Sequence, residues 1–131
     1  LSNVISINGG VQLDLMGQEN AESTGTRQLS GIGGQMDFLE GAYRSKGGKG
    51  FICINSSRVT KDGERKSNIL ATIPGGSTIS APRTMIQYVA TEYGIASLSG
   101  KTLRERAEAM ASIAHPDFRE ELMKYAQENF K

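Results

Sequence analysis

The sequence contains few of the residues that mark several common protein classes. Among its 131 residues there is a single cysteine, which excludes an internal disulfide framework. Without an export signal, that scarcity predicts a reducing, cytoplasmic compartment. Cys53 lies in the apolar run from Phe51 to Ile54, where we expect a buried structural thiol rather than a reactive one. No segment approaches the roughly 18 apolar residues of a membrane span, so no membrane partner is expected.

Neither sign of charge is in excess. Fifteen basic residues nearly balance fourteen acidic ones, and a net charge of +1 predicts no nucleic-acid partner. The one histidine, His115, has no second histidine or nearby cysteine to share a metal, so we expect no metal site and favour a helix-capping role. The length suits one domain with a real core. Because the chain begins at Leu1 rather than Met, we interpret residues 1–131 as a single-domain fragment of a larger protein.

What the sequence does have is glycine, concentrated in the stretch from Ser30 to Phe38. Gly31, Gly33 and Gly34 remove the Cβ atoms from a short loop, so its backbone can take positive φ and approach a ligand closely. The residues that follow have a helical apolar pattern with Asp37 in the first turn. A helix N-terminus of this kind can bind an anion or the oxyanion of a transition state. The alternative, a tight turn that only lets a strand and a helix pack, stays open on spacing alone.

Short apolar runs before and after this loop predict strands. Residues 4–7 and 11–15 flank Asn8-Gly9-Gly10, which is typical of a hairpin turn. Residues 16–30 have little apolar signal and are interpreted as a long polar connection. Further strands are expected at 51–55, 69–73 and 86–90, and the basic residues 56–66 are expected to form an exposed excursion.

The last third of the sequence predicts two helices. Thr102 and Glu105 form a capping box, and an apolar stripe follows at helical spacing. Pro116 suits the first position of a second helix, which begins after His115. Strands that alternate with helices and end in a helical pair indicate an α/β domain.

Two motifs resemble nucleotide-binding sequences, but each lacks a glycine that the motif requires. Ser99-Gly100-Lys101-Thr102 ends like a phosphate-binding P-loop, but the glycine that the motif requires is Ile95. The glycine loop is not a dinucleotide fingerprint, because its third glycine would fall on Met36.

Five blocks of the sequence, in order and at natural spacing, resemble the C-terminal part of the acetyl-CoA hydrolase/transferase family. Within it the likeness is to CoA-transferases of the 4-hydroxybutyrate or butyrate:acetate type. The blocks are residues 30–38, 45–49, 91–96, 100–101 and 114–119. The resemblance implies an open α/β sheet with flanking helices, of the NagB/RpiA/CoA-transferase type. It also implies an enzyme that uses coenzyme A as a substrate, with an acyl-CoA and a short-chain carboxylate as its partners.

The resemblance also implies roles for single residues. In the family a glutamate attacks the thioester, and backbone N–H groups of the glycine loop hold the oxyanion that results. The matching oxyanion positions here are Gly33 and Gly34, while Gly31 and Lys61 match positions expected to bind CoA. For Lys61 the alternative is a solvated lysine in a turn.

The nucleophilic glutamate of the family belongs to a segment that would precede Leu1. Glu92 follows a predicted buried strand, and we interpret it as a structural or supporting carboxylate because the family has it in addition to the nucleophile. The fragment is therefore expected to be inactive alone, and its partners to include the missing N-terminal domain. A homo-oligomer is expected for the full-length protein.

Two alternatives to transfer remain open. A hydrolase of the same family would deliver water to the glutamyl thioester. A non-enzymatic module would instead bind an anionic partner through the basic excursion of Arg58, Lys61, Arg65 and Lys66, and that binding would depend strongly on salt.

Overall fold

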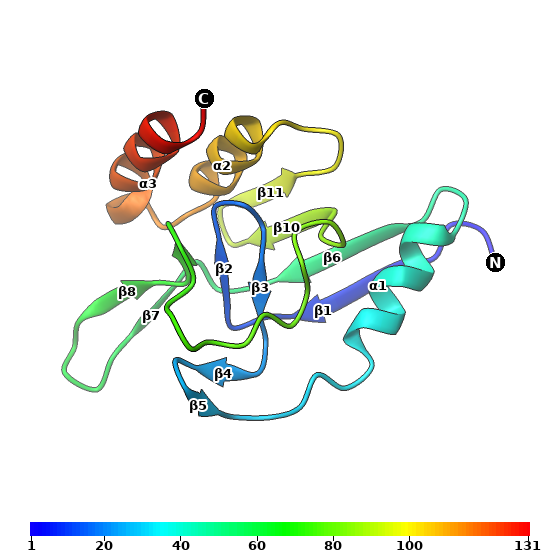
Figure 1. Ribbon diagram of the computed structural model, residues 1–131, viewed down its shortest axis with the longest axis horizontal. Coiled ribbons are helices and arrows are strands. Elements are labelled where there is room, and N and C mark those ends of the chain that lie inside the picture. Colours follow the sequence, from blue (N-terminus) through cyan, green and yellow to red (C-terminus); the bar gives the residue numbers. More distant parts are fainter.

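A four-stranded sheet forms the centre of the molecule. In the computed structural model, which describes residues Leu1 to Lys131, its strands stand in the order β1 (Ile5–Gly9), β6 (Lys49–Cys53), β10 (Tyr88–Thr91) and β11 (Gly94–Ser97) (Figure 1). The first three run parallel, and β11 returns antiparallel to β10. The helix α1 (Gln35–Arg44) connects β1 to β6 along the chain and packs against both strands. This confirms the predicted open α/β sheet and the predicted helix after the glycine loop.

One face of the sheet is buried against α1 and the rest of the core. Ile52, Val89 and Ala96 are paired neighbours across β6, β10 and β11, and all three are buried. Gly50 lets the helix approach, because a Cβ atom at that position would lie 3.2 Å from the side chain of Leu39. Apolar burial on this one face therefore fixes how α1 lies across the sheet.

The predicted hairpin between residues 4–7 and 11–15 is wrong. β2 (Gln12–Asp14) leaves the central sheet and forms a second one, antiparallel to β3 (Glu19–Asn20) and parallel to β9 (Ile69–Leu70). The alternation of apolar residues located both strands correctly, but it has no information about which strand pairs with which. Leu13 is fully buried because β9 supplies a partner from a distant part of the sequence.

The polar connection of residues 16–30 is ordered and partly buried. It contains β3 and the small ladder of β4 (Ser23–Thr24) and β5 (Arg27–Gln28). The buried Asn20 side chain organises it, because its Oδ1 accepts from the backbone N–H groups of Glu22 and Ser23, both at 3.0 Å. Hydrogen bonds rather than apolar contacts stabilise this segment, and hydrophobic patterning therefore did not detect it.

The basic excursion is a two-stranded hairpin of β7 (Ser57–Val59) and β8 (Arg65–Ser67) that extends from the body of the protein (Figure 1). This confirms the predicted exposed excursion. The expected strand at 69–73 is reduced to the two residues of β9, and β11 was not predicted.

The C-terminal helical pair is confirmed as α2 (Leu103–Ser112) and α3 (Pro116–Asn129), which pack against each other. The capping box forms as expected: Glu105 donates its N–H to Thr102 Oγ1 at 3.2 Å, and Thr102 donates its N–H to Glu105 Oε2 at 2.8 Å. His115 caps α3 through Nδ1, which accepts from the Asp117 N–H at 3.2 Å. None of the three helices is long and apolar enough to cross a bilayer.

Candidate functional site

The carboxyl ends of the three parallel strands meet at one edge of the central sheet. A shallow hollow of about 390 Å³ lies there and is lined by Gly10, Cys53, Ile54, Asn55, Ala90 and Thr91. In open α/β sheets, ligands bind outside the carboxyl ends of the strands. This edge is therefore the candidate functional site.

The glycine loop lies toward the same edge. The Asn3 N–H donates to the Lys46 carbonyl at 2.8 Å, which places the end of α1 beside the amino ends of the strands. Because α1 (Gln35–Arg44) packs along β1 and β6, its beginning is directed toward the carboxyl ends (Figure 1). The topology thus directs the N-terminus of this helix toward the same edge, but none of the glycine-loop residues lines the hollow.

The loop itself is open to solvent. Gly31, Gly33 and Gly34 are all exposed, and a Cβ atom at Gly31 or Gly33 would contact nothing within 4 Å. Gly33 has φ +60°, a left-handed conformation that favours glycine. Gly34 is the N-cap residue of α1, and no side chain caps the helix. The loop is therefore open at Gly31 and Gly33, and its role in ligand binding stays a prediction.

A buried polar contact supports the loop from below. Gln35, the first residue of α1, donates its side-chain amide to Glu19 Oε2, and both side chains are buried. The other carboxylate oxygen of Glu19 has no hydrogen-bond partner. It lies against Gly10, where a Cβ atom would be only 2.7 Å from it. Glu19 therefore connects the start of α1 to the strand end that lines the hollow.

Burial raises the pKa of Glu19 to about 7, and the nearby Glu22 carboxylate adds to this effect while the hydrogen bond from Gln35 opposes it. The Glu22 carbonyl accepts from the N–H groups of Leu29 and Ser30, at 2.7 and 3.1 Å, just before the glycine loop. Its carboxylate accepts from the Ser80 hydroxyl at 2.6 Å. Two buried glutamates thus hold both ends of the loop.

The sequence did not indicate these supporting residues. Glu19 lies in a segment without apolar signal, and Gln35 is not part of the apolar pattern that predicts the helix. A glutamate and a glutamine at a separation of sixteen residues form no recognisable motif. The only available hint was a polar side chain at the first position of α1, on the side that faces the core.

Glu92 lies in the turn between β10 and β11, directly after Thr91, which lines the hollow. Its Oε1 accepts from the Ser56 N–H at 2.8 Å, and hydrogen bonding from Ser56 holds the pKa of Glu92 below its usual range. The carboxylate is exposed. It is therefore charged at neutral pH and lies beside the candidate site, while its supporting role remains a prediction.

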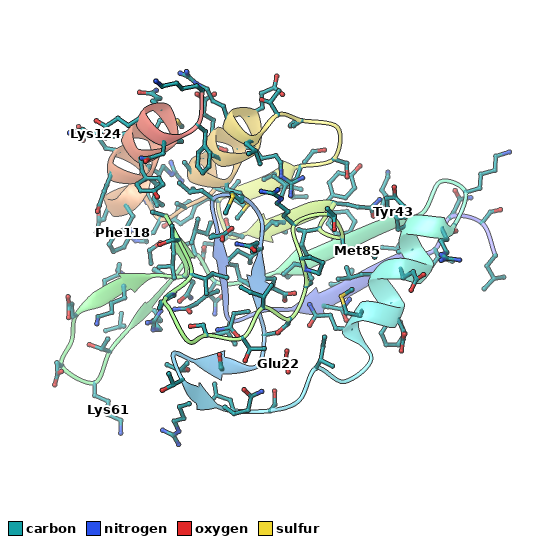
Figure 2. All side chains as sticks on the ribbon, in the orientation of Figure 1. Glu22, Tyr43, Lys61, Met85, Phe118 and Lys124 are labelled. Carbon is teal, nitrogen blue, oxygen red and sulfur yellow. The ribbon has the colours of Figure 1, made fainter.

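Lys61 is not brought to this site. It occupies the exposed tip of the β7–β8 hairpin, and Figure 2 shows its side chain directed away from the body of the protein. It does not line the hollow at the strand ends. The predicted contact of Lys61 with CoA stays a prediction.

The Cys53 thiol is exposed, so its predicted burial is wrong. Residues alternate between the two faces of a strand, and only Ile52 and Ile54 point into the core. An apolar run of four residues could not show that one face of this strand is uncovered.

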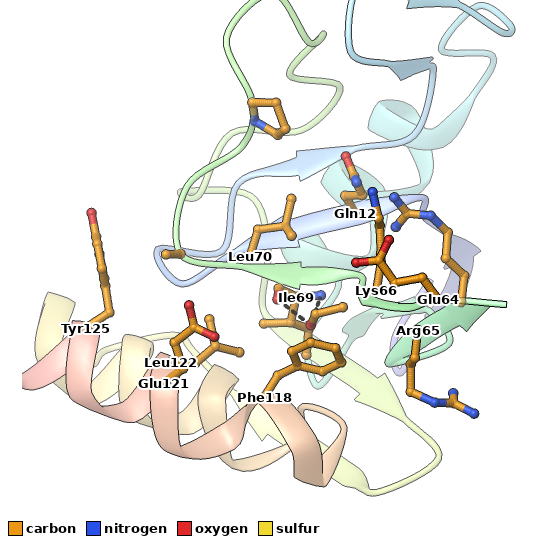
Figure 3. A pocket seen from close by; sticks show the side chains of 14 residues that line it. Gln12, Glu64, Arg65, Lys66, Ile69, Leu70, Phe118, Glu121, Leu122 and Tyr125 are labelled. Atoms are coloured by element: carbon orange, nitrogen blue, oxygen red, sulfur yellow. Dashed lines mark hydrogen bonds between the residues drawn. The ribbon is translucent and has the colours of Figure 1, made fainter. Parts of the chain in front are cut away.

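A second cavity, of about 400 Å³, lies between the hairpin, β9 and α3 (Figure 3). Ile69, Leu70, Phe118 and Leu122 supply its apolar lining, and its charged lining combines Arg58, Arg65 and Lys66 with Glu64 and Glu121. Arg58 and Arg65 already donate to Asn68 and Ser57, both at 2.7 Å. This cavity was not expected from the sequence, and it contains none of the glycine-loop residues.

The sequence profile of the acetyl-CoA hydrolase/transferase C-terminal domain matches residues 1–126. The chain belongs to the acetyl-CoA hydrolase/transferase family. It is 49% identical to the butyryl-CoA:acetate CoA-transferase of Anaerostipes caccae over 97% of this chain and 28% of that protein. It is also 49% identical to the 4-hydroxybutyrate coenzyme A transferase of Clostridium kluyveri, over 98% of this chain and 29% of that one. The family resemblance of the sequence is thereby confirmed.

Solved structures of similar proteins have the same fold. RipA from Yersinia pestis matches with a TM-score of 0.83 at 41% identity, over 97% of this chain and 28% of RipA. The 4-hydroxybutyrate CoA-transferase of Porphyromonas gingivalis matches with a TM-score of 0.73 at 40% identity, over 96% of this chain and 27% of that protein. The acetyl-CoA hydrolase/transferase domain described here thus has the predicted CoA-transferase fold. It spans little more than a quarter of the length of these relatives.

Proposed function

We propose that this chain is the C-terminal part of an enzyme that moves CoA between an acyl-CoA and a short-chain carboxylate such as acetate, butyrate or 4-hydroxybutyrate. The observation that carries the proposal is the exposed loop of Gly31, Gly33 and Gly34 at the uncapped N-terminus of α1. The loop lies toward the edge where the parallel strands end. The names of the relatives in this family supply the substrate class.

The proposed reaction proceeds by covalent catalysis. A glutamate carboxylate from the segment outside this chain attacks the thioester carbonyl, the C–S bond breaks, and CoA leaves as a thiolate. The thiolate then attacks the glutamyl carbonyl of the mixed anhydride and releases the first carboxylate. The product is a glutamyl-CoA thioester, and an acceptor carboxylate reverses both steps to form the new acyl-CoA. Each attack passes through a tetrahedral oxyanion.

The glycine loop supplies what this reaction needs. Backbone N–H groups at Gly33 and Gly34 hold the oxyanion, and one such preorganised donor contributes roughly 3 kcal/mol of transition-state stabilisation. The positive φ of Gly33 and the lack of neighbours around the loop allow a substrate to approach the backbone. Glu19 and Gln35 fix the position of the loop from below. The charged Glu92 carboxylate follows Thr91, which lines the hollow, and it holds the Ser56 N–H beside that strand end.

We expect the 131-residue chain alone to transfer no CoA from an acyl-CoA to acetate, while the full-length protein does so. The physical reason is that the oxyanion donors lower a barrier but do not form the covalent intermediate. An assay of acetyl-CoA formation from butyryl-CoA and acetate, at matched concentrations of the two proteins, measures this. Turnover by the chain alone that Glu92→Gln abolishes would overturn both the supporting role of Glu92 and the placement of the nucleophile.

Lys61→Ala in the full-length protein is expected to raise the KM for acyl-CoA several-fold and to change kcat little. A lysine that contacts CoA far from the reacting carbonyl stabilises the ground state and the transition state equally. Steady-state kinetics with acyl-CoA as the varied substrate test this, and Lys124→Ala on the exposed surface of α3 is the control. If the two variants have the same KM as the parent protein, Lys61 is a solvated turn residue.

Hydrolysis is the second candidate function. An acetyl-CoA hydrolase of Kluyveromyces lactis is 32% identical over 93% of this chain and 22% of its own length. Both reactions use the same glutamyl-CoA intermediate and the same oxyanion donors. Following acetyl-CoA with and without a second carboxylate distinguishes them, because a hydrolase consumes thioester at the same rate in both cases.

A further inference from the structure

The central sheet has a second face that nothing in this chain covers. Residues that neighbour one another across β1, β6, β10 and β11 point to the same side, and two paired rows cross this face. One row is Ile7, Phe51, Tyr88 and Ser97, and the other is Gly9, Cys53, Ala90 and Ile95.

These rows are apolar and open to solvent. Ile7 is 69% exposed, Ile95 at the opposite edge is 62% exposed, and Ile5 in β1 is 53% exposed. Between them the rings of Phe51 and Tyr88 stack with their centroids 4.9 Å apart. Apart from Lys49, no charged side chain belongs to the residues of these four strands. The surface therefore has the composition of a domain core rather than of a wet sheet face.

The topology indicates what should cover such a surface. Sheets of parallel strands are normally covered on both faces, since their crossover connections lie on the faces. Here α1 covers only one face, and α2 and α3 lie beyond the β11 end of the sheet (Figure 1). The uncovered face of this parallel sheet therefore indicates that further structure packs on it.

We propose that this face is the docking surface for the part of the full-length protein that precedes Leu1. The relatives have the length for it, because this chain accounts for only 28% of a curated relative that it matches over nearly its whole length. β1 is both the first strand of the chain and a free edge of the sheet, so the preceding chain arrives next to the uncovered face. This inference rests on the proposed function only in that the chain works within a longer enzyme.

The docking also completes the active site. Gly9 and Cys53 are at the carboxyl ends of their strands and belong to the uncovered face, and Cys53 lines the hollow described above. A segment on this face would therefore border the hollow. It would bring residues of the preceding segment, the proposed nucleophilic glutamate among them, to the edge of the sheet where the hollow lies.

Cys53 provides a direct probe of the docking. In the native full-length protein we expect maleimide labelling of Cys53, followed by peptide mass spectrometry, to be at least 100-fold slower than in the protein unfolded in urea. Asp62→Cys at the exposed tip of the β7–β8 hairpin is the control, and it should label rapidly in the native protein. Rapid labelling of Cys53 in the native full-length protein would overturn the proposal.

The dependence of Cys53 protection on protein concentration distinguishes docking of the preceding segment from docking of a second copy of the protein. Protection by the same polypeptide persists when the full-length protein is diluted until it is monomeric by analytical ultracentrifugation. Protection that disappears on dilution would assign the face to a second copy and would also overturn the proposal.

A substitution gives an independent test that does not require catalysis. Ile7→Asp is expected to lower the Tm of the full-length protein by several degrees more than Val59→Asp, because it places a charge in a buried interface. Val59 is a matched control, since it is 57% exposed on the hairpin and outside this face. Equal shifts for the two variants would contradict the docking. An intact CoA-transferase whose Cys53 labels rapidly would refute this inference and leave the proposed function standing.

Discussion

Gly34→Val in the full-length protein is expected to lower kcat by about 10²-fold or more while the KM for acyl-CoA changes little. The oxyanion exists only in the transition state, so loss of a donor slows the chemical step more than it weakens substrate binding. The valine side chain would crowd the open N-terminus of α1, where the substrate carbonyl must approach.

The structure makes this prediction sharper than the sequence did. A Cβ atom at Gly34 meets only the ring of Phe38, at 3.3 Å, and that ring is largely exposed and able to move. Gly34 has φ −93°, which any residue can adopt. The protein should therefore fold with valine at this position, and a change in kcat would report on the reaction rather than on folding.

The measurement combines the Tm with the single-turnover rate of glutamyl-CoA formation on the same sample. Gly41→Val is the matched control, because Gly41 is an exposed residue of α1 and a Cβ atom there contacts nothing within 4 Å. A Gly34→Val protein that is unstable but forms the adduct at the normal rate would refute the oxyanion role and restore the packing interpretation.

Glu19→Gln is expected to stabilise the chain at pH 8 by up to about 3 kcal/mol and to change its stability little at pH 4.5. Burial raises the pKa of Glu19 from 4.5 to about 7. Between these two pH values the folded protein keeps a proton that the unfolded chain loses, so the free energy of unfolding decreases as the pH rises. Below pH 4.5 Glu19 is protonated in both the folded and the unfolded state. Above pH 7 it is charged in both states, and the decrease in the free energy of unfolding is complete.

Urea unfolding at pH 5 and pH 8 tests this in the parent chain and in Glu19→Gln. The parent chain should lose free energy of unfolding between pH 5 and pH 8, and the neutral amide of Glu19→Gln should remove most of that loss. In a chain of this size the loss corresponds to a Tm difference of roughly 10 °C. Glu128→Gln, at an exposed position of α3, should retain the pH dependence of the parent. If Glu19→Gln loses as much stability between pH 5 and pH 8 as the parent does, Glu19 is charged in the folded state.

Gly34→Val and Glu19→Gln change two parts of one arrangement, the glycine loop and the buried carboxyl group beneath it. In this arrangement the proposed function and the stability of the fold make opposite demands. A carboxyl group buried beneath the glycine loop without a cationic partner lowers the stability of the fold once it is charged. Its contact with Gln35 fixes the first turn of α1, which presents the loop. We therefore expect the charge of this buried residue, and with it the support of the loop, to change with pH near 7.

Features set by neighbouring residues could be predicted from the sequence. The helix that begins after Gly34, the capping box of Thr102 and Glu105, and the cap that His115 makes on α3 all have the form expected. Each depends on residues within one turn of one another, so spacing alone specifies the contact. The glycine loop belongs to this group, because the positive φ of Gly33 is a local property.

Features set by contacts between distant residues were decided only by the tertiary structure. Alternation located β1 and β2 but not their partners, because β1 pairs with β6 and β2 with β9. The same alternation could not say that Cys53 faces solvent, since that depends on what covers the sheet. The burial of Glu19 beneath Gln35 requires a polar segment to fold back under α1. Local spacing determined which elements this chain forms, whereas pairing and burial, which depend on residues far apart in the sequence, determined how those elements build a site.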